Sequence, residues 1–339
     1  MSRLLVTGGA GFIGSNFVHY WIARHPDDRI VVLDSLTYAG NLANLEAAAQ
    51  HPGFRFVHGD IRDQGLVESL LREEELDSII HLAAESHVDR SISGPDIFVD
   101  VNIKGTHSLL KAARRAWMEN PGTDPERYRF HHVSTDEVYG SIEEGSWPET
   151  HPVSPNSPYS ASKAGSDLLA LAYHRTHGVP VLVTRCSNNY GPYQFPEKVI
   201  PLFVTNLIDG LSVPLYGDGG NVRDWLHVDD HCHGIQLVLE GGRPGEVYNI
   251  GGGTEMSNRE LTGLLLDACG ADWSSVEHVT DRKGHDRRYS VDISKIAGEL
   301  GYAPRVPFTD GLAATAAWYR DNRAWWETLK QWTAAGVSR

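Results

Sequence analysis

The sequence predicts an α/β protein built on a doubly wound parallel sheet, with a smaller C-terminal α/β domain. Three observations support this fold class. Short runs rich in Val, Ile and Leu alternate with longer amphipathic stretches as far as about residue 185. A glycine-rich turn separates the first such run from the first amphipathic stretch. Beyond residue 185 the alternation gives way to loops rich in Pro, Gly and Asn, which are typical of ligand-binding regions.

The expected strands are nearly continuous apolar runs, as is typical of parallel strands that helices cover on both faces. These runs are "LLVTG", "IVVLD", "FRFVHGD", "SIIHLAA", "YRFHHVST" and "VPVLVTR". Between them, helical spacing of Leu, Ile, Val and Ala with Ser or Asp near the start predicts helices at 11–24, 64–72, 97–118 and 159–177. The last two are long and rich in Ala and Leu on one side, which suits a subunit interface as well as packing onto the sheet.

The loops "CSNNYGPYQFPEK" and "LYGDGGNVRDW" mark the change to a second region. After them "DWLHVDD" and "GEVYNIGGG" again have the character of strands, and helices follow near 258–269 and 308–327. We therefore expect one domain from 1–185 and 225–250, and a second from 186–224 and 251–339.

Composition limits the classes of partner. The chain has 339 residues, of which 41% are apolar and 9% aromatic, enough for the core of a globular protein. Its 44 acidic against 30 basic residues give a formal charge of -14, which disfavours nucleic acid and anionic membrane surfaces. We expect a small-molecule partner, with no nucleic acid and no membrane.

Cysteine usage and the amino terminus indicate a cytoplasmic protein. The three cysteines are odd in number and far apart, which predicts neither a disulfide framework nor a metal-binding Cys pair. The chain begins with "MSRLLVTGG", without a basic stretch followed by a long apolar run. His231 and His233 invite a metal interpretation, but alternate residues at a helix start diverge, so we expect no metal site.

A dinucleotide site is predicted by "VTGGAGFIGS", in which Gly8, Gly11 and Gly14 lie between the first strand and the first helix. Glycines there let the backbone approach a pyrophosphate, whose charge is met by helix N-terminal amides. Asp34, at the end of the second strand, suits the two ribose hydroxyls and would repel a ribose phosphate, so the cofactor is expected to be NAD. In "HGDIRD", Asp60 is placed to meet the adenine amino group and Ile61 to form an apolar wall.

A proton-transfer pair is predicted by "YSASKAGSDL", where Tyr159 and Lys163 are four residues apart and share a helical face. A phenol with a pKa of about 10 is a poor base at neutral pH, but the nearby ammonium and a positively charged nicotinamide favour the phenolate. Ser134 and Thr135 end the preceding strand. A Tyr and a Lys at this spacing are most often simply an exposed pair on a helix. The glycine motif upstream favours a catalytic role for this pair.

Together these motifs are similar to the extended short-chain dehydrogenase/reductase family and, more narrowly, to the bacterial dTDP-glucose 4,6-dehydratases. The narrower resemblance rests on segments that span nearly the whole chain: "VTGGAGFIGSNF", "DSLTYAGN", "FVHGDIRD", "HLAAESHVDRSI", "VSTDEVYGS", "SPYSASKAGSD", "TRCSNNYGPYQFPEKVIPL", "LYGDGGNVRDWLHVDDH", "YNIGG" and "DRKGHDRRYSVD". It implies an NAD-dependent lyase of deoxysugar biosynthesis, a homodimer in the cytoplasm, that converts dTDP-glucose to dTDP-4-keto-6-deoxyglucose.

The adjacent acids Asp136 and Glu137 fit such a reaction. After oxidation at C4 of the sugar, the C5 proton needs a base and the C6 hydroxide needs a proton, and two close carboxyls tend to have separated pKa values. The resemblance implies Glu137 as the C5 base, Asp136 as the C6 acid, Thr135 as a hydrogen-bonding group at C4 and Tyr159 as the C4 base, with Lys163 beside it. Neighbours on a regular strand point to opposite faces, so the chain must turn at about Thr135. Solvated loop acids or a helix cap are the alternative.

The resemblance also implies two sets of binding residues. The cofactor set is Gly8, Gly11, Phe12, Ile13, Gly14, Asp34, Ser35, Leu36, Thr37, Asp60, Ile61, Leu82, Ala83, Ala84, Ser86, Val101, Ser134, Tyr159, Lys163 and Asn189. The substrate set is Ser86, His87, Thr135, Asn188, Lys198, Val199, Pro214, Leu215, Tyr216, Arg223, Asn258, Asp281, Arg282, Lys283, Gly284, His285, Arg288 and Tyr289. Lys283 stands where the family usually has proline, and Val101 where it often has Thr, which bears on loop shape and cofactor packing.

Three other functions remain open at this point. A nucleotide-sugar 4-epimerase would use the same scaffold without the acid pair. A UDP-sugar 4,6-dehydratase would carry out the same reaction on a substrate whose nucleobase is uracil. A non-catalytic NAD-binding protein would be expected to lack Tyr159 or Lys163, and both are present.

Overall fold

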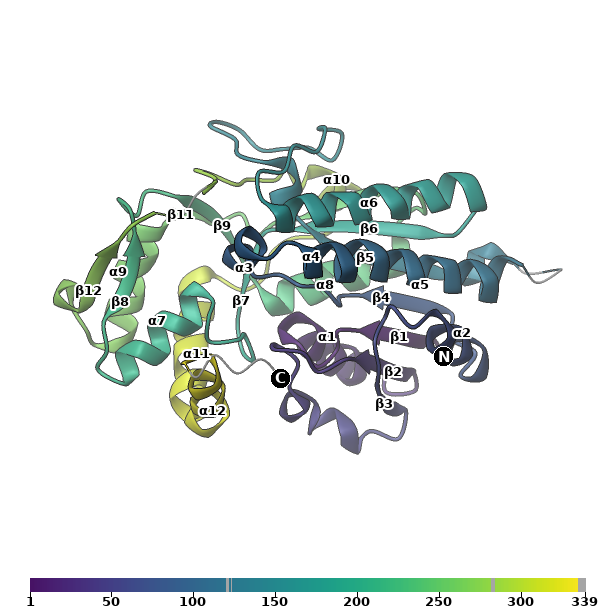
Figure 1. Cartoon of the computed structure of the whole chain (residues 1–339), viewed down its shortest axis with the longest axis horizontal. Coiled ribbons are helices and arrows are strands. Elements are labelled where there is room, and N and C mark those ends of the chain that lie inside the picture. The colour runs from purple at the N-terminus through teal and green to yellow at the C-terminus, as the bar shows by residue number, and fades with distance from the viewer. Residues whose placement is uncertain (120–121, 123, 282–283, 335–339) are drawn as a thin grey trace.

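In this computed structural model the chain is described over residues 1–119, 122, 124–281 and 284–334. Within these residues seven strands form one parallel sheet, in the order β10-β6-β5-β4-β1-β2-β3 (Figure 1). This is the doubly wound sheet that the sequence predicts. Its strands are β1 (Arg3–Thr7), β2 (Arg29–Asp34), β3 (Phe54–His58), β4 (Ser78–His81), β5 (Arg129–Thr135), β6 (Val181–Cys186) and β10 (Val247–Ile250).

Helices cover both faces of this sheet, because successive strand residues point to opposite sides. Leu4 and Val6 of β1 belong to a core with residues of α1 and α8, whereas Leu5 belongs to a second core with residues of α2, α5 and α6. The strands are therefore buried on both faces, which explains their apolar runs. The helices packed around the sheet are α1 (Phe12–Arg24), α2 (Gln64–Glu73), α3 (Val88–Ser93), α4 (Asp96–Phe98), α5 (Thr106–Ala113), α6 (Pro158–His177), α8 (Val228–Gly241) and α10 (Ser294–Leu300).

The remaining elements form a smaller group with its own apolar core, at the left of Figure 1. They include a sheet of order β11-β9-β7 and a pair β12-β8. "DWLHVDD" is a strand only as far as His227, because α8 begins at the next residue, and β9 pairs with β7 and β11. The bounds are β7 (Asn188–Tyr190), β8 (Val213–Tyr216), β9 (Val222–His227), β11 (Glu255–Ser257), β12 (Val276–Val279), α7 (Val199–Ile208), α9 (Asn258–Cys269), α11 (Phe308–Asp321) and α12 (Arg323–Ala334).

Two predicted helices differ in detail. The single helix expected at 308–327 is wrong, because Asn322 has non-helical backbone angles (φ −112°, ψ 39°) that end α11, and its side-chain amide donates to the Trp318 carbonyl. The helix expected at 97–118 contains two π-helical turns, η3 (Val99–Gly105) and η4 (Arg114–Met118), around α5. In η3 the Asn102 side chain accepts a hydrogen bond from the Glu85 N–H and donates one to the Glu85 carbonyl. Single-turn helices complete the fold: η1 (Leu42–Leu45), η2 (Ala48–Gln50), η5 (Pro125–Arg127), η6 (Asp136–Tyr139) and η7 (Trp273–Ser275).

Across the residues given above, no helix has both the length and the apolar character needed to cross a bilayer.

Candidate active site

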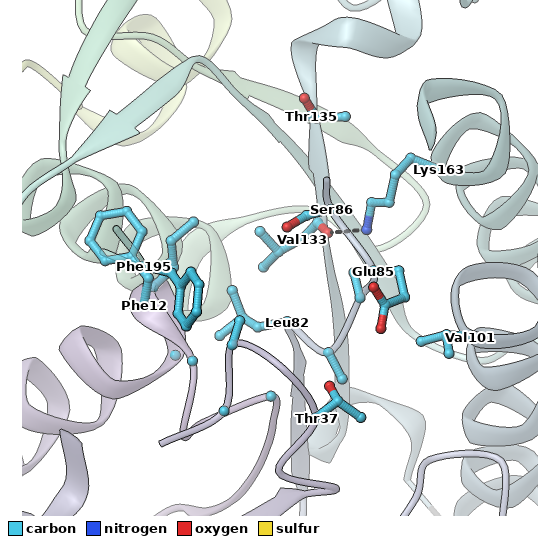
Figure 2. Close-up of a pocket in the computed structure, with 18 of the residues that line it drawn as sticks. Phe12, Thr37, Leu82, Glu85, Ser86, Val101, Val133, Thr135, Lys163 and Phe195 are labelled. Atoms are coloured by element: carbon cyan, nitrogen blue, oxygen red, sulfur yellow. Dashed lines mark hydrogen bonds between the residues drawn. The ribbon is translucent and has the colours of Figure 1, made fainter. Parts of the chain in front are cut away.

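A cavity of about 340 Å³ lies at the carboxyl ends of the central strands. Ligands of open parallel sheets bind at this edge, where the strand order reverses. The first glycine loop and the ends of β2, β4 and β5 contribute to its wall, together with α6 and the segment after β6. Figure 2 shows Phe12 and Phe195 on one side of the cavity and Lys163 and Thr135 on the other.

The glycine loop is closely packed at the positions that the sequence singles out. Gly8 has a φ of +72°, and a Cβ there would lie 2.6 Å from the backbone nitrogen of Ala83. A Cβ on Gly14 would lie 2.2 Å from the Gly8 carbonyl oxygen. No side chain caps the N-terminus of α1, whose cap residue is Gly11. Its first amides are therefore available to an anion such as a pyrophosphate.

Asp34 links the glycine loop to the segment that follows β2. Its carboxylate accepts hydrogen bonds from the backbone N–H of Ala10 at 2.9 Å and of Leu36 at 2.8 Å. Burial raises the pKa of Asp34, while these two amides lower it. Asp34 lines the cavity, so its carboxylate can meet ribose hydroxyls there.

Asp60 and its neighbour Arg62 form a two-pronged ion pair at the rim of the cavity, with Arg62 Nη2 at 2.6 Å from Asp60 Oδ2. The hydrogen bonds from Arg62 lower the pKa of Asp60. The expected contact of Asp60 with an adenine amino group therefore has to be made by a carboxylate that already has a partner.

The two adjacent acids lie directly after β5, which ends at Thr135, and the chain continues as the 3₁₀ turn η6. The predicted turn is thus confirmed. Both Asp136 and Glu137 line the cavity. Thr135 holds the turn, because its hydroxyl accepts from the Glu137 N–H and donates to Asp136 Oδ1, both at 3.3 Å. The other oxygen of Asp136 is buried and has no hydrogen-bond partner among the described residues.

Asp136 is the more deeply buried acid, with 3% of its surface exposed. Burial raises its pKa well above the usual carboxyl value, and the charges of Glu137 and Asp224 raise it further. Arg223 and the Thr135 hydroxyl act in the opposite direction without cancelling this effect. Asp136 therefore binds its proton more tightly than an ordinary carboxyl group does.

Tyr159 and Lys163 lie on one face of α6, and both line the cavity. The expectation that Lys163 favours the Tyr159 phenolate stays a prediction. In the structure the Lys163 ammonium donates to the Val133 carbonyl at 2.8 Å, and burial followed by the Glu137 charge raises the pKa of Tyr159 well above its usual value.

Most residues of the expected cofactor set line this one cavity, the exception being Leu36, whose side chain packs against the apolar core. Four of the expected substrate residues also line it, namely Ser86, Thr135, Asn188 and Lys198. Lys198 donates to the Ser86 carbonyl at 3.0 Å and so connects the second region to the loop after β4.

The other expected substrate residues lie outside this lining, mainly on elements of the smaller group. Tyr216 is 38% exposed on β8, and its ring makes an edge contact with His285. The Arg223 guanidinium lies over the Tyr289 ring, 4.4 Å from its centroid. Arg288 forms a two-pronged ion pair with Glu255. The rest are His87 before α3, Val199 in α7, Pro214 and Leu215 in β8, Asn258 in α9, and Asp281 and Gly284 near His285; Arg282 and Lys283 lie outside the described residues.

The two histidines of the HCH motif contact different neighbours. His231 Nδ1 lies 2.9 Å from Asn189 Oδ1, and His233 Nδ1 lies 3.2 Å from the Tyr20 hydroxyl. Within the described part of the chain, no three His, Cys, Asp or Glu side chains are grouped so as to hold a metal ion.

The sequence did not identify one polar wall of the cavity. Tyr38, Glu85 and Glu197 line it, and the Arg90 guanidinium lies 4.3 Å from the centroid of the Tyr38 ring. Phe195 packs edge-on against Tyr38. The positions of Tyr38 and Glu197 in the sequence could have identified them. Tyr38 directly follows "DSLT" and Glu197 directly precedes Lys198 in "FPEKV", so both are neighbours of residues already expected in the site.

Comparison with known proteins agrees with this geometry. Residues 5–315 match the family model described as GDP-mannose 4,6 dehydratase. A dTDP-glucose 4,6-dehydratase of Streptomyces antibioticus is 63% identical over 97% of this chain and 96% of its own length. The chain belongs to the dTDP-glucose 4,6-dehydratase family.

Solved structures agree with this assignment. The dTDP-glucose 4,6-dehydratase DesIV of Streptomyces venezuelae, solved with NAD and TYD bound, is 64% identical, with a TM-score of 0.92 over 96% of this chain and 99% of that one. A UDP-glucose 4-epimerase from Thermotoga maritima, solved with UDP-glucose, is 31% identical, with a TM-score of 0.85 over 95% of this chain and 99% of that one. The scaffold is therefore shared with epimerases, while the higher identity is to dTDP-glucose 4,6-dehydratases.

Replacing Asp136 by Asn should stabilise this dTDP-glucose 4,6-dehydratase family member in a pH-dependent way. The folded chain binds the Asp136 proton more tightly than the unfolded chain does, so ionisation above about pH 4 destabilises the wild type. Asn cannot ionise. The free energy of unfolding of Asp136→Asn minus that of the wild type, both measured by urea denaturation, should therefore increase as the pH rises from about 5 to 8.

A suitable control is Asp218→Asn at the protein surface. The hydrogen bonds from Arg287 lower the pKa of Asp218 to about 2, so this variant should show no gain that grows with pH. A stability difference for Asp136→Asn that stays constant across the pH range would show that Asp136 is ionised throughout.

Proposed function

We propose that the chain is an NAD-dependent hydro-lyase that converts dTDP-glucose to dTDP-4-keto-6-deoxyglucose in deoxysugar biosynthesis. The observation that carries this proposal is that Asp136, Glu137 and Tyr159 line one cavity. An epimerase needs a group that exchanges a proton at C4, whereas loss of water also needs a base at C5 and an acid at C6. The dTDP-glucose 4,6-dehydratases at 63% and 62% identity support the choice of substrate.

The cavity fits NAD, as its closely packed glycine loop and the uncapped N-terminus of α1 indicate. Gly11 and the amides after it would hold the pyrophosphate. Asp34 would accept from the adenosine ribose hydroxyls, and its charge would repel a ribose phosphate. When bound, NAD supplies a hydride acceptor at C4 of the sugar and returns that hydride to C6. The remaining steps belong to the side chains.

We assign the proton transfers as follows. Tyr159 takes the C4 hydroxyl proton, and Thr135 hydrogen-bonds the oxygen that becomes a carbonyl. Glu137 then removes the C5 proton, which is acidic because it is α to the C4 ketone, and gives it back to C5 when hydride is added at C6. Asp136 gives its proton to the departing C6 hydroxide, and its raised pKa favours the protonated form that this step needs.

The nucleotide would be held by the smaller group of elements. A diphosphate calls for Arg and amide donors, which Arg223 and Asn188 provide, and a flat base calls for an aromatic neighbour, which Tyr216 provides. Lys198 reaches both regions, because it directly precedes α7 and donates to the Ser86 carbonyl. The expected division into 1–185 with 225–250 for the cofactor, and 186–224 with 251–339 for the nucleotide sugar, stays a prediction; in the structure β9 pairs within the smaller group and α10 packs against the core of the large sheet.

The chain is further proposed to act as a homodimer in the cytoplasm. Four large apolar side chains on α3, α4, η3 and α6 are exposed: Ile92, Ile97, Val99 and Leu168. Leu168 is the most exposed of these four, with 57% of its surface in contact with solvent. A second copy packed against these helices would bury them. The three cysteines are all free, which suits a reducing compartment.

Leu168→Asp should prevent this association, because a carboxylate buried in an apolar interface without a partner is strongly unfavourable. We expect the molar mass measured by light scattering after gel filtration to fall by about half. Leu211→Asp is the matched control, since Leu211 is 53% exposed but follows α7 in the other region, and it should keep the wild-type mass. Equal masses for all three proteins would refute the interface.

Glu137→Gln tests the dehydratase proposal. The variant keeps the size of the side chain but cannot remove the C5 proton, so oxidation at C4 proceeds and the later steps stop. Incubation with dTDP-glucose should produce stable absorbance of reduced nicotinamide, and ketosugar formation followed by NMR should fall at least about 100-fold.

The alternatives predict other outcomes of the same assay. An epimerase would retain turnover in Glu137→Gln, and a non-catalytic protein would give neither reduced cofactor nor ketosugar even in the wild type. A UDP-sugar dehydratase would give ketosugar from UDP-glucose in preference to dTDP-glucose. Any of these results would replace the proposed function.

A further inference from the structure

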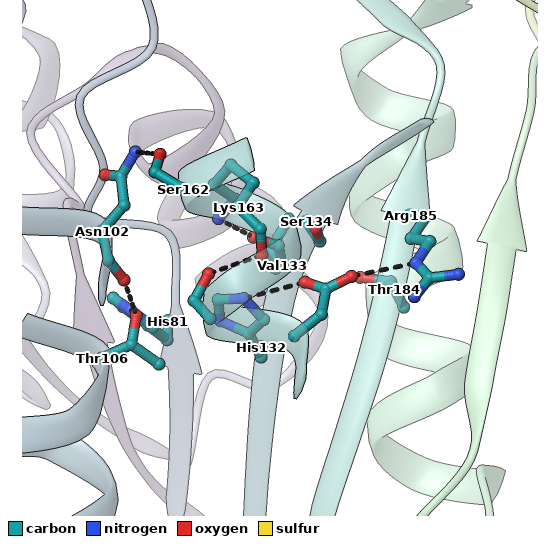
Figure 3. Close-up of polar contacts among 12 residues, drawn as sticks. His81, Asn102, Thr106, His132, Val133, Ser134, Ser162, Lys163, Thr184 and Arg185 are labelled. Carbon is teal, nitrogen blue, oxygen red and sulfur yellow. Dashed lines mark hydrogen bonds and ion pairs between the residues drawn. The ribbon is translucent and has the colours of Figure 1, made fainter. Parts of the chain in front are cut away.

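Asp167 is an acid that the reaction described above does not use. It lies on α6, one helical turn after Lys163, and none of its surface is exposed. Its two carboxylate oxygens point to the two strands beneath the helix. Oδ1 lies 3.3 Å from His132 Nε2 of β5, and Oδ2 accepts a hydrogen bond from Arg185 Nε of β6 at 2.9 Å (Figure 3).

The carboxylate is ionised although it is fully buried. Burial raises the pKa of Asp167, but the adjacent His132 side chain and the charge of Arg185 outweigh it, so the pKa lies below the usual value. Burial lowers the pKa of His132 to about 4, so its imidazole is neutral near pH 7. The Asp167 charge is therefore paired with Arg185, and a second cation lies one helical turn away on α6.

That cation is Lys163, on the same face of α6. Its side chain is 5% exposed, and burial lowers its pKa to about 8, while the Asp167 charge raises it. The ammonium donates to the Val133 carbonyl, next to Ser134 at the end of β5. Without the carboxylate one turn away, the cost of burying this ammonium would favour the neutral amine at lower pH.

Through Arg185, Asp167 also reaches the turn that carries the two acids. The Arg185 guanidinium lies 4.6 Å from the centroid of the Tyr139 ring. Tyr139 is the last residue of η6, and its hydroxyl donates to Asn249 Oδ1 at 2.9 Å. Asp167 thus connects α6, with Tyr159 and Lys163, to both ends of the segment that includes Asp136 and Glu137.

We propose that Asp167 is a positioning residue of this site: its buried carboxylate keeps Lys163 charged and holds the end of β5 and the η6 turn in register with α6. The proposal rests on the function proposed above. Asp167 reaches no reacting atom, since it does not line the cavity, and its effect passes through neighbours that include Lys163, His132 and Arg185.

Several other titratable groups surround the Lys163 ammonium. Tyr159 shares its helix, His81 lies on β4, His132 on β5 and Cys186 at the end of β6, with Asp136 and Glu137 following β5. Burial lowers the pKa of both histidines and raises those of Cys186 and Tyr159, so these four groups are neutral near pH 7. The raised pKa of Asp136 favours its neutral form. Changing Asp167 therefore changes the main charge that supports the ammonium.

The test measures hydride transfer in single turnovers, with Glu137→Gln as the parent because reduced nicotinamide accumulates in it. Adding Asp167→Asn removes the charge and keeps the shape. The pH at which the rate falls on the alkaline side should move lower by about one unit, because an opposite charge nearby shifts a pKa by this much or more. The rate below that pH should fall about 10-fold.

Asp230→Asn in the same parent is the matched control. Asp230 is as buried as Asp136, accepts from the backbone N–H groups of Arg305 and Val306, and does not line the cavity. The Asp230→Asn substitution should lower the free energy of unfolding without moving the pH at which the rate falls on the alkaline side. An Asp167→Asn profile that coincides with the parent and with this control would overturn the inference.

Two further readings keep the test decisive. If Asp167→Asn does not fold, Asp167→Glu retains the charge but displaces it, and should keep the alkaline limb in place while lowering the rate about 10-fold. Parent-like rates in Asp167→Glu would overturn the inference. If the Glu137→Gln parent itself forms no reduced nicotinamide, the proposed function fails, a result distinct from a normal parent with an unshifted Asp167→Asn profile.

Discussion

Two adjacent carboxyl groups have to reach one cavity, and this constraint shapes the centre of the molecule. On a regular strand Asp136 and Glu137 would point to opposite faces, so β5 ends at Thr135 and the chain turns at once. The turn buries Asp136 next to a second acid, which raises its pKa. The raised pKa favours the protonated carboxyl group, which is the form that the proposed role as proton donor to a poor leaving group requires.

The layer below this turn is polar although the strands around it are apolar. His131 and His132 occupy the middle of β5, with pKa values of about 3 and 4 because of burial. As neutral imidazoles they provide hydrogen-bonding groups without adding charge, so the ionised groups at this level are Asp167, Arg185 and Lys163. Side chains from α6, β5 and β6 therefore support the acids, and the geometry of the site depends on helix packing as well as on the strand end.

Local rules made part of this architecture predictable from the sequence. Gly8 and Gly14 are required by close backbone approaches, and the turn after Thr135 follows from strand periodicity. Contacts between distant segments were not predictable: Tyr38 and Phe195 are far apart in the sequence but their rings pack together, and the Lys163 ammonium donates to a backbone carbonyl of β5. The break between α11 and α12 comes from the non-helical backbone of Asn322, which helical periodicity does not encode.

The central claim is that one cavity oxidises C4, eliminates water between C5 and C6 and reduces C6 without releasing the hydride. It is tested most directly with dTDP-glucose deuterated at C4, mixed with unlabelled substrate and added NAD. The account predicts a 4-keto-6-deoxy product in which the deuterium is at C6 of the same molecule, as NMR and mass spectrometry would show. Deuterium that appears in free cofactor, in solvent or in product from unlabelled substrate would contradict it.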